Sequence, residues 1–137
     1  MKSYAPPPDK SITIRALLLA AVAEGQSRIE NPLDCGDTQA ALSCLAALGA
    51  QFCRDGNALV VEGRGLKGLK HPAGPLCAGE SGALARLLAG LLAGQAFPSE
   101  IAGSGSLLAR PMEKTAAALR KLGANVRTKK GLLPFLI

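Results

Sequence analysis

The sequence has few aromatic residues, a single histidine and no long run of either sign of charge. It contains no Trp, one Tyr and three Phe among 137 residues. Proteins that bind single-stranded nucleic acid stack bases on aromatic side chains and follow the backbone with clustered cations. Here no basic run exceeds two residues, as in the pair Lys129-Lys130. These absences argue against base stacking and a basic stripe, and we expect no nucleic-acid partner.

Metal-ligand spacings are also missing. The four cysteines never form a CxxC pair, and one histidine, His71, is available beside them. Their intervals match no common zinc motif, so we expect no metal site. Cys44 lies on an apolar helical face, where a buried free thiol is the usual interpretation. The cysteines are Cys35, Cys44, Cys53 and Cys77.

No apolar run is long enough for a membrane span. The first such run, Ala16 to Ala23, is eight residues long, whereas a span needs about 20. Met1-Lys2 leads into prolines rather than into the apolar core of a secretory signal. We therefore expect a cytoplasmic protein with no membrane partner.

What the chain does contain is a large aliphatic fraction and an excess of cations. Hydrophobic residues make up 48% of it, so the core is expected to consist of Ala, Leu, Val and Ile. The length suits a single domain with a real core. Sixteen Lys and Arg against ten Asp and Glu give a net charge of +6. Such a balance suits a small phosphorylated or carboxylated ligand.

An internal repeat organises the chain. "RALLLAAVAEG" from Arg15 resembles "RLLAGLLAGQ" from Arg86, and Leu-Gly-Ala closes a second helical segment in both halves. Offsets of 71 and 74 residues indicate two copies of one unit. Glycines that follow the apolar segments predict that the helices stop there. Turn residues at 55–57 and 129–131, between alternating segments, predict two hairpins. The predicted helices are 11–24, 37–48, 81–93 and 110–122, and the strands after the first helices are 26–30 and 97–102.

The fold class is therefore α/β. The leading strand of the first copy would fall in the Pro-rich N-terminus, and that of the second in the stretch before Leu76. We expect one partial domain, 1–137, with repeat 1 at about 5–63 and repeat 2 at about 74–137.

Polar residues recur at the helix starts of both copies. Lys10, Ser11 and Arg15 open the first helix, whereas Ser81, Gly82 and Arg86 open the corresponding one. If the copies stack, all four helix N-termini face one side and form an anion-binding surface. Capping alone could explain Ser11 and Ser81, and also Asp37 at the start of the helix predicted at 37–48. It does not explain the cations, because a helix N-terminus favours anions.

Four motifs resemble those of the enolpyruvyl transferases, and within them the 5-enolpyruvylshikimate-3-phosphate synthase family. They are "PDKSITIRALLLAA", "CGDTQAAL", "GESGALAR" and "LLARPMEKTAAALRKLGA", in the family's order across nearly the whole chain. The resemblance implies transfer of an enolpyruvyl group from phosphoenolpyruvate to shikimate-3-phosphate, without a metal or an organic cofactor. The uridine-nucleotide branch of the superfamily matches the first motif less well.

The resemblance also implies roles for individual residues. Lys10 and Asp37 correspond to groups at the reacting centre, with Lys10 also contacting phosphoenolpyruvate. Ser11 and Arg15 correspond to residues that hold the shikimate substrate. The remaining positions correspond to residues that bind phosphoenolpyruvate: Gly82, Arg86 and Arg110. Arginine suits this role because its planar fork pairs bidentately with carboxylate or phosphate.

The chain departs from the family pattern at several positions. Glu80 stands where asparagine is usual, Ala83 where threonine is usual, and Gly36 replaces one of two paired aspartates. Glu80 adds a negative charge beside a site for anions.

The family fold implied is an inside-out α/β barrel of repeated β-α-β-α-β-β units, about two of which this chain would supply. Two hypotheses follow. The chain is either the N-terminal part of the transferase, inactive alone and partnered by a missing C-terminal domain, or a non-catalytic phosphate-binding module. An uncovered apolar edge would favour a homodimer.

Overall fold

The computed structural model describes residues 7–137, which form a mixed α/β structure with two sheets. The predicted fold class is confirmed at this level. The order helix, strand, helix, hairpin occurs twice along the chain. In chain order the elements are α1 (Lys10–Val22), β1 (Glu24–Glu30), α2 (Gly36–Ala47), β2 (Gln51–Asp55), β3 (Ala58–Arg64), β4 (Leu76–Cys77), α3 (Gly82–Leu92), β5 (Glu100–Ala102), the 3-10 helix η1 (Gly105–Ala109), α4 (Glu113–Lys121), β6 (Arg127–Lys129) and β7 (Leu132–Leu136).

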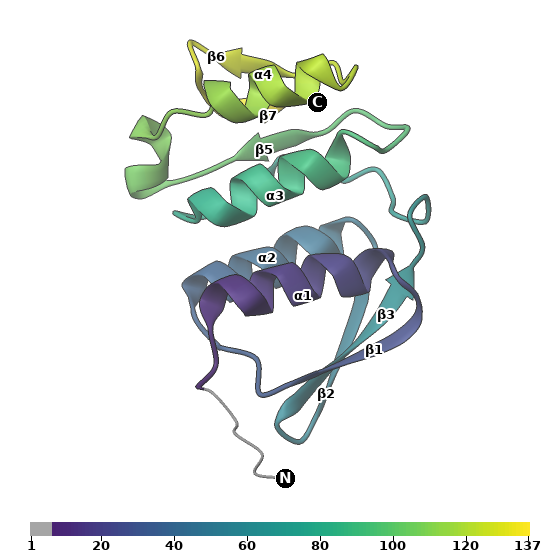
Figure 1. Ribbon diagram of the computed structural model, residues 1–137. Helices are drawn as coiled ribbons and strands as arrows, with labels where there is room; N and C mark the ends of the chain where they lie inside the picture. The colour runs from purple at the N-terminus through teal and green to yellow at the C-terminus, as the bar shows by residue number, and fades with distance from the viewer. Residues whose placement is uncertain (1–6) are drawn as a thin grey trace, which may run out of the picture.

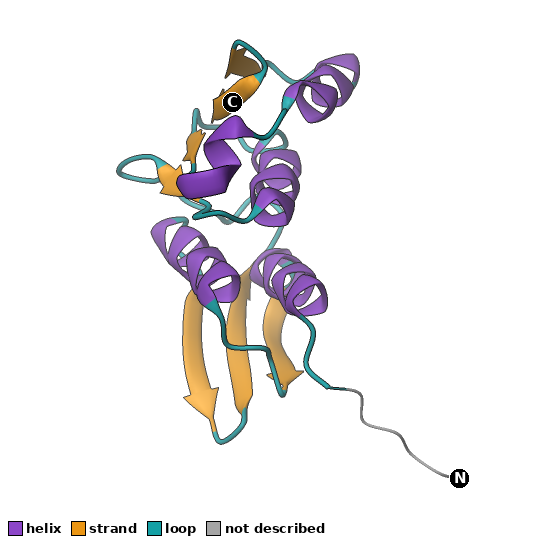
Figure 2. Cartoon of the chain, turned by 90° about the vertical axis from the view of Figure 1, so that its left-hand side faces the viewer, coloured by secondary structure: helices purple, strands orange, loops and turns teal. Residues whose placement is uncertain are grey.

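The two sheets are covered by helices of their own half of the chain. The first sheet has the order β1-β3-β2 and is antiparallel throughout, with α1 and α2 lying over it (Figure 1). The second has the order β4-β5-β7-β6, in which only β4 and β5 run parallel. Figure 2 shows α3 and α4 on the same side of this sheet. All four α-helices begin at the same side of the molecule (Figure 1).

Aliphatic side chains fill the core, as the composition predicts. Leu17 of α1, Leu45 of α2 and Leu88 of α3 are completely buried, and Phe135 of β7 is the one fully buried aromatic among the described residues. Burying such a side chain contributes about 1.5–3 kcal/mol. Contacts between α1 and α3 join the two halves into one core. None of the described helices has the length and hydropathy needed to cross a membrane.

Some predicted boundaries were wrong, and proline explains the largest error. The helix predicted from residue 110 begins at Glu113, because Arg110 precedes Pro111 and takes an extended conformation. Instead, η1 occupies 105–109, which the sequence did not predict. Gly49 and Gly123 follow α2 and α4 with positive φ, as expected for helix stops. By contrast, α1 ends at Val22, before Gly25.

The predicted leading strands had different outcomes. That of the second copy is β4, which starts at Leu76 itself rather than before it. That of the first copy falls mainly on residues 1–6, outside the described part of the chain, and residues 7–9 form no strand.

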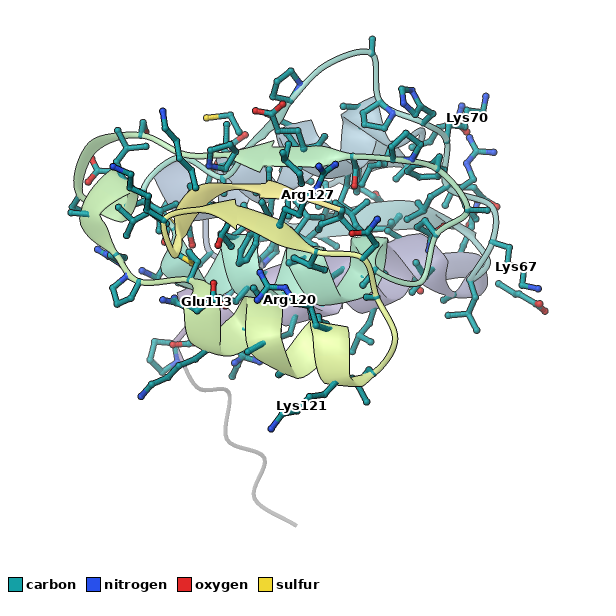
Figure 3. All side chains as sticks on the ribbon, turned by 90° about the horizontal axis from the view of Figure 1, so that it is seen from above. Lys67, Lys70, Glu113, Arg120, Lys121 and Arg127 are labelled. Atoms are coloured by element: carbon teal, nitrogen blue, oxygen red, sulfur yellow. The ribbon has the colours of Figure 1, made fainter. Side chains whose placement is uncertain are left out.

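Side-chain contacts fix α4 against the second hairpin. Glu113 and Arg120 form an ion pair along α4 (Figure 3). The Glu113 carboxylate also accepts a hydrogen bond of 2.9 Å from the Thr128 hydroxyl of β6. The Arg120 Nε–H donates to the Val126 carbonyl at 2.6 Å. At the start of α4, the Met112 N–H donates to the Gly131 carbonyl at 2.8 Å. These bonds hold the segment that carries Arg110 in place.

Candidate anion-binding site

Three helix N-termini meet at one cavity. The starts of α1, α2 and α3 surround a hollow of about 360 Å³, and the segment after β5 closes one side of it. Backbone N–H groups at helix starts without internal partners make such a place suitable for anions. The lining residues are Lys10, Ser11, Asp37, Glu80, Ser81, Gly82, Ala83, Ser106 and Arg110.

Lys10 and Asp37 form an ion pair across this cavity, with Nζ and Oδ2 3.0 Å apart. Burial acts to raise the pKa of Asp37, but hydrogen bonding to Lys10 and Ser81 and the charges of Lys10 and Arg110 outweigh it, so that pKa lies below its usual value. The hydrogen bond and charge of Asp37 raise the pKa of Lys10. Both groups are therefore charged at neutral pH. Their side chains remain 49% and 24% exposed, so a ligand can reach the pair.

Gly82, Arg86 and Arg110 come together at the first turn of α3. A Cβ on Gly82 would lie 2.6 Å from Nη1 of Arg86 and 3.3 Å from Nη1 of Arg110. A side chain at this position would therefore push the Arg86 guanidinium aside and crowd that of Arg110. Arg86 donates to the Gly82 carbonyl at 2.9 Å and to the Pro111 carbonyl at 3.0 Å, which ties α3 to the segment that carries Arg110.

Arg15 lies apart from this cavity. Its Nη1 donates to the carbonyl of Ser11 at 3.0 Å, the same contact that Arg86 makes with Gly82 in the second copy. Arg15 instead lines an apolar groove of about 320 Å³ between α1 and α3. Of the seven predicted site residues, Lys10, Ser11, Asp37, Gly82 and Arg110 line the cavity. Arg86 adjoins Gly82, whereas Arg15 lies one turn away along α1.

Capping explains only one of the three residues for which it was considered. Ser81 does cap α3, accepting from the Leu84 N–H at 3.4 Å. At α1 the cap is Asp9, which accepts from the Ile12 N–H at 2.8 Å. At α2, the Thr38 hydroxyl accepts from the Cys35 N–H at 3.0 Å. Ser11 and Asp37 therefore lie inside their helices, so capping was the wrong interpretation for both.

Ser106 was not predicted as a site residue, and Glu80 had no predicted role at the site. The Ser106 N–H donates to Oε2 of Glu80 at 2.9 Å, and the Ser106 hydroxyl accepts from Arg110 at 3.0 Å. The Gly-Ser-Gly-Ser run at 103–106 was the available signal, because such runs expose backbone N–H groups.

The cysteines lie in different surroundings. Cys44 is 2% exposed, as predicted, and burial raises its pKa to about 11. Cys53 and Cys77 are exposed, Cys35 is half-buried, and all four are free. Within residues 7–137, no group of three or more His, Cys, Asp and Glu side chains is arranged to hold a metal ion.

Purified protein is expected to contain no zinc, because no set of ligands converges among the described residues. Elemental analysis after dialysis against a metal-free buffer measures this directly. The Cys44→Ala and Cys77→Ala variants should give the same value as the unmodified chain. One equivalent of zinc per chain, lost in either variant, would contradict the expectation.

The fold and the site define an α/β protein that gathers three helix N-termini, Lys10 and Arg110 around one cavity suited to anions. A family model described as EPSP synthase (3-phosphoshikimate 1-carboxyvinyltransferase) matches residues 3–137. The chain belongs to this family.

Individual relatives agree with this assignment. The 3-phosphoshikimate 1-carboxyvinyltransferase of Salinibacter ruber is 44% identical over 96% of this chain and 31% of its own length. That of Solibacter usitatus is 42% identical over 93% of this chain and 30% of its own length. The solved EPSP synthase of Acinetobacter baumannii aligns with a TM-score of 0.91 and 36% identity, over 98% of this chain and 31% of its own. The chain thus spans about 30% of the length of the curated relatives that it matches.

Proposed function

We propose that this chain supplies the N-terminal half-site of a 3-phosphoshikimate 1-carboxyvinyltransferase. The enzyme would transfer the enolpyruvyl group of phosphoenolpyruvate to shikimate-3-phosphate, on the pathway to aromatic amino acids. One observation carries the proposal: Lys10, Asp37, Gly82 and Arg110, taken from four separate motifs, line a single cavity at three helix N-termini. Both substrates are anions, which this arrangement suits.

The residues would divide the binding between the two substrates. Lys10 and Arg110 would hold the phosphate or carboxylate of phosphoenolpyruvate, with the Gly82 N–H beside them. Arg86 would support them from behind, since it already bonds to Gly82 and Pro111. Ser11 and Arg15, at the start of α1, would hold shikimate-3-phosphate.

In the proposed reaction, a proton adds to the methylene carbon of phosphoenolpyruvate and the substrate's 5-hydroxyl bonds to the adjacent carbon, losing its own proton. The tetrahedral intermediate then releases phosphate and a methyl proton, which restores the double bond. Lys10 and Asp37 are suited to the proton transfers. A ligand anion that takes the Lys10 ammonium would remove the countercharge of Asp37, raising its pKa and making it a better proton acceptor.

The alternative is a non-catalytic phosphate-binding module of the same fold. The open exposure of the Lys10–Asp37 pair favours it, because a transition state is stabilised best where water is excluded. Both candidates predict anion binding, and only turnover in the presence of the rest of the enzyme separates them.

The finer architecture is also part of the proposal. We infer that 5–63 and 74–137 are two units of an inside-out α/β barrel, because both contain the order helix, strand, helix, hairpin. The partner would be the C-terminal domain of the enzyme. A homodimer is a second proposal, because the edge strands β1, β2, β4 and β6 are each paired on one side only in the described sheets. The cytoplasmic location stays a prediction.

Shikimate-3-phosphate is expected to bind the chain, and Arg15→Ala is expected to weaken binding about tenfold, the effect of losing one charge-assisted contact. Titration calorimetry or ligand-observed NMR measures both affinities. Arg127→Ala, which removes an arginine of β6, is the matched control and should leave the affinity unchanged. Equal affinities for Arg15→Ala and the unmodified chain would contradict the assignment of Arg15.

A further inference from the structure

Glu80 stands at the cavity wall, yet its carboxylate is turned toward the protein's own backbone. Oε2 accepts a hydrogen bond of 2.9 Å from the Ser106 N–H, 26 residues further along the chain. Close by, the Ser104 N–H donates to the Gly79 carbonyl at 2.8 Å. The segment before α3 is thereby joined to the segment that leads to Arg110.

Gly105 makes room for this carboxylate. Its φ is +50°, and a Cβ at this position would lie 2.5 to 2.7 Å from the three atoms of the Glu80 carboxyl group. Any other residue would therefore displace the carboxylate or the loop. The contact between Glu80 and the loop thus depends on a particular glycine.

Ser106 connects Glu80 to Arg110. Its N–H is held by Glu80, while its hydroxyl accepts a hydrogen bond of 3.0 Å from Nη2 of Arg110. The neighbouring Leu107 is completely buried and fixes the other side of the turn. Nη1 of the same guanidinium points to Gly82, where a Cβ would be 3.3 Å away.

The charge of Glu80 is stable in these surroundings. The pKa of Glu80 lies below its usual value, first because the Ser106 N–H donates to its carboxylate. The Ser106 hydroxyl and the charge of Arg110 also lower this pKa, whereas burial and the charge of Asp37 raise it. The carboxylate is therefore ionised at neutral pH and remains a full acceptor.

We propose that Glu80 is a positioning residue for Arg110. Its carboxylate lies over Gly105 and holds the backbone N–H of Ser106. The Ser106 hydroxyl in turn holds the Arg110 guanidinium beside Gly82, at the proposed anion-binding cavity. The proposal rests on the proposed function only for the identity of the anion, phosphoenolpyruvate. It gives a reason for a carboxylate that would otherwise only repel the ligand.

Two substitutions separate the hydrogen bond of Glu80 from its charge. Glu80→Gln removes the charge but keeps an oxygen for the Ser106 N–H, whereas Glu80→Ala removes both. If Glu80 acts only by repulsion, the two variants bind phosphoenolpyruvate equally well. If it positions Arg110, Glu80→Ala binds roughly threefold to tenfold more weakly than Glu80→Gln, the effect of one lost hydrogen bond. Calorimetric titration with phosphoenolpyruvate gives this ratio, and a ratio of one overturns the proposal.

A second pair of variants tests the same contact from the loop. Gly105→Ala should displace the Glu80 carboxylate and weaken binding as Glu80→Ala does. Gly56→Ala is the matched control, because Gly56 also has a positive φ, +59°, but has no atom within 4 Å of the added Cβ. If Gly105→Ala and Gly56→Ala bind phosphoenolpyruvate equally, the contact does not position the site.

A measurement without ligand keeps this proposal separate from the proposed function. The Arg110 Nε–H signal in ¹⁵N NMR, assigned by its loss in Arg110→Lys, reports the order of the guanidinium through its heteronuclear NOE. The NOE should be high in the unmodified chain and in Glu80→Gln, and lower in Glu80→Ala and Gly105→Ala. An equally high NOE in Glu80→Ala overturns the positioning role, whereas absent phosphoenolpyruvate binding in the unmodified chain counts against the proposed function.

Discussion

The 137-residue chain alone is expected to release no phosphate from a mixture of shikimate-3-phosphate and phosphoenolpyruvate. Its cavity presents cations and helix N-termini from one side, and the Lys10 side chain is 49% exposed to water. Preorganised charges stabilise a transition state when they surround it and exclude solvent. The relatives that carry the activity are about three times as long, since the chain spans 31% of the Salinibacter ruber enzyme. Losing a single general acid or base alone slows a reaction by about a hundredfold or more.

The assay compares phosphate release by the chain, by the chain mixed with the remaining part of the Salinibacter ruber enzyme, and by that whole enzyme as positive control. Turnover should appear in the mixture and in the control only. In the mixture, Lys10→Ala should abolish it, whereas Lys67→Ala, a substitution outside the cavity, should leave it intact. Turnover by the chain alone would contradict the half-site proposal. Its absence from the mixture, with binding retained, would favour the non-catalytic module.

Gly63→Ala is expected to lower the free energy of unfolding by about 3 kcal/mol, at the upper end for an inserted methyl group. Gly63 lies in β3 opposite Gly25 of β1, where the strand passes under the end of α1. An added Cβ would be 2.1 Å from the Ala23 carbonyl oxygen and 2.8 Å from that of Ala20. Both are backbone atoms in hydrogen bonds, so relief requires α1 to move off the sheet.

Urea unfolding followed by far-UV circular dichroism measures this loss. Gly74→Ala is the matched control, because Gly74 has no positive φ and no atom within 4 Å of the added Cβ. That variant should unfold at the same urea concentration as the unmodified chain or slightly higher, since alanine restricts the unfolded state. A Gly63→Ala midpoint equal to that of Gly74→Ala would show that β3 and α1 do not pack as closely as described.

The sequence predicted the helices and hairpins well where local chemistry decides them. Gly49 and Gly123 end their helices, and the turns at Gly56 and Gly131 lie where the alternating pattern breaks. The late start of α4 was predictable too, because Pro111 restricts the residue before it. The 3-10 helix before it has no such local signal.

The site was predicted in its composition but not in its contacts. Which residue caps α1 depends on where the backbone enters the helix, and Asp9 precedes Ser11 by only two positions. Arg15 bends back to its own helix because a long side chain has several partners within reach. The Glu80–Ser106 bond joins residues 26 positions apart, so the sequence showed its charge but not its partner.

The common direction of the four helices bears on how fast ligands arrive. Each helix places roughly half an elementary charge of positive sign at its start, and all four starts lie on the side where Lys10 and Arg110 lie. Together with the net charge of +6, these aligned dipoles produce a field that extends beyond the surface and draws small anions toward one face. The Debye length of about 8 Å at physiological ionic strength limits its reach. The association rate of small anions should therefore be raised electrostatically in dilute buffer and fall steadily as salt is added. Their dissociation rate should change less.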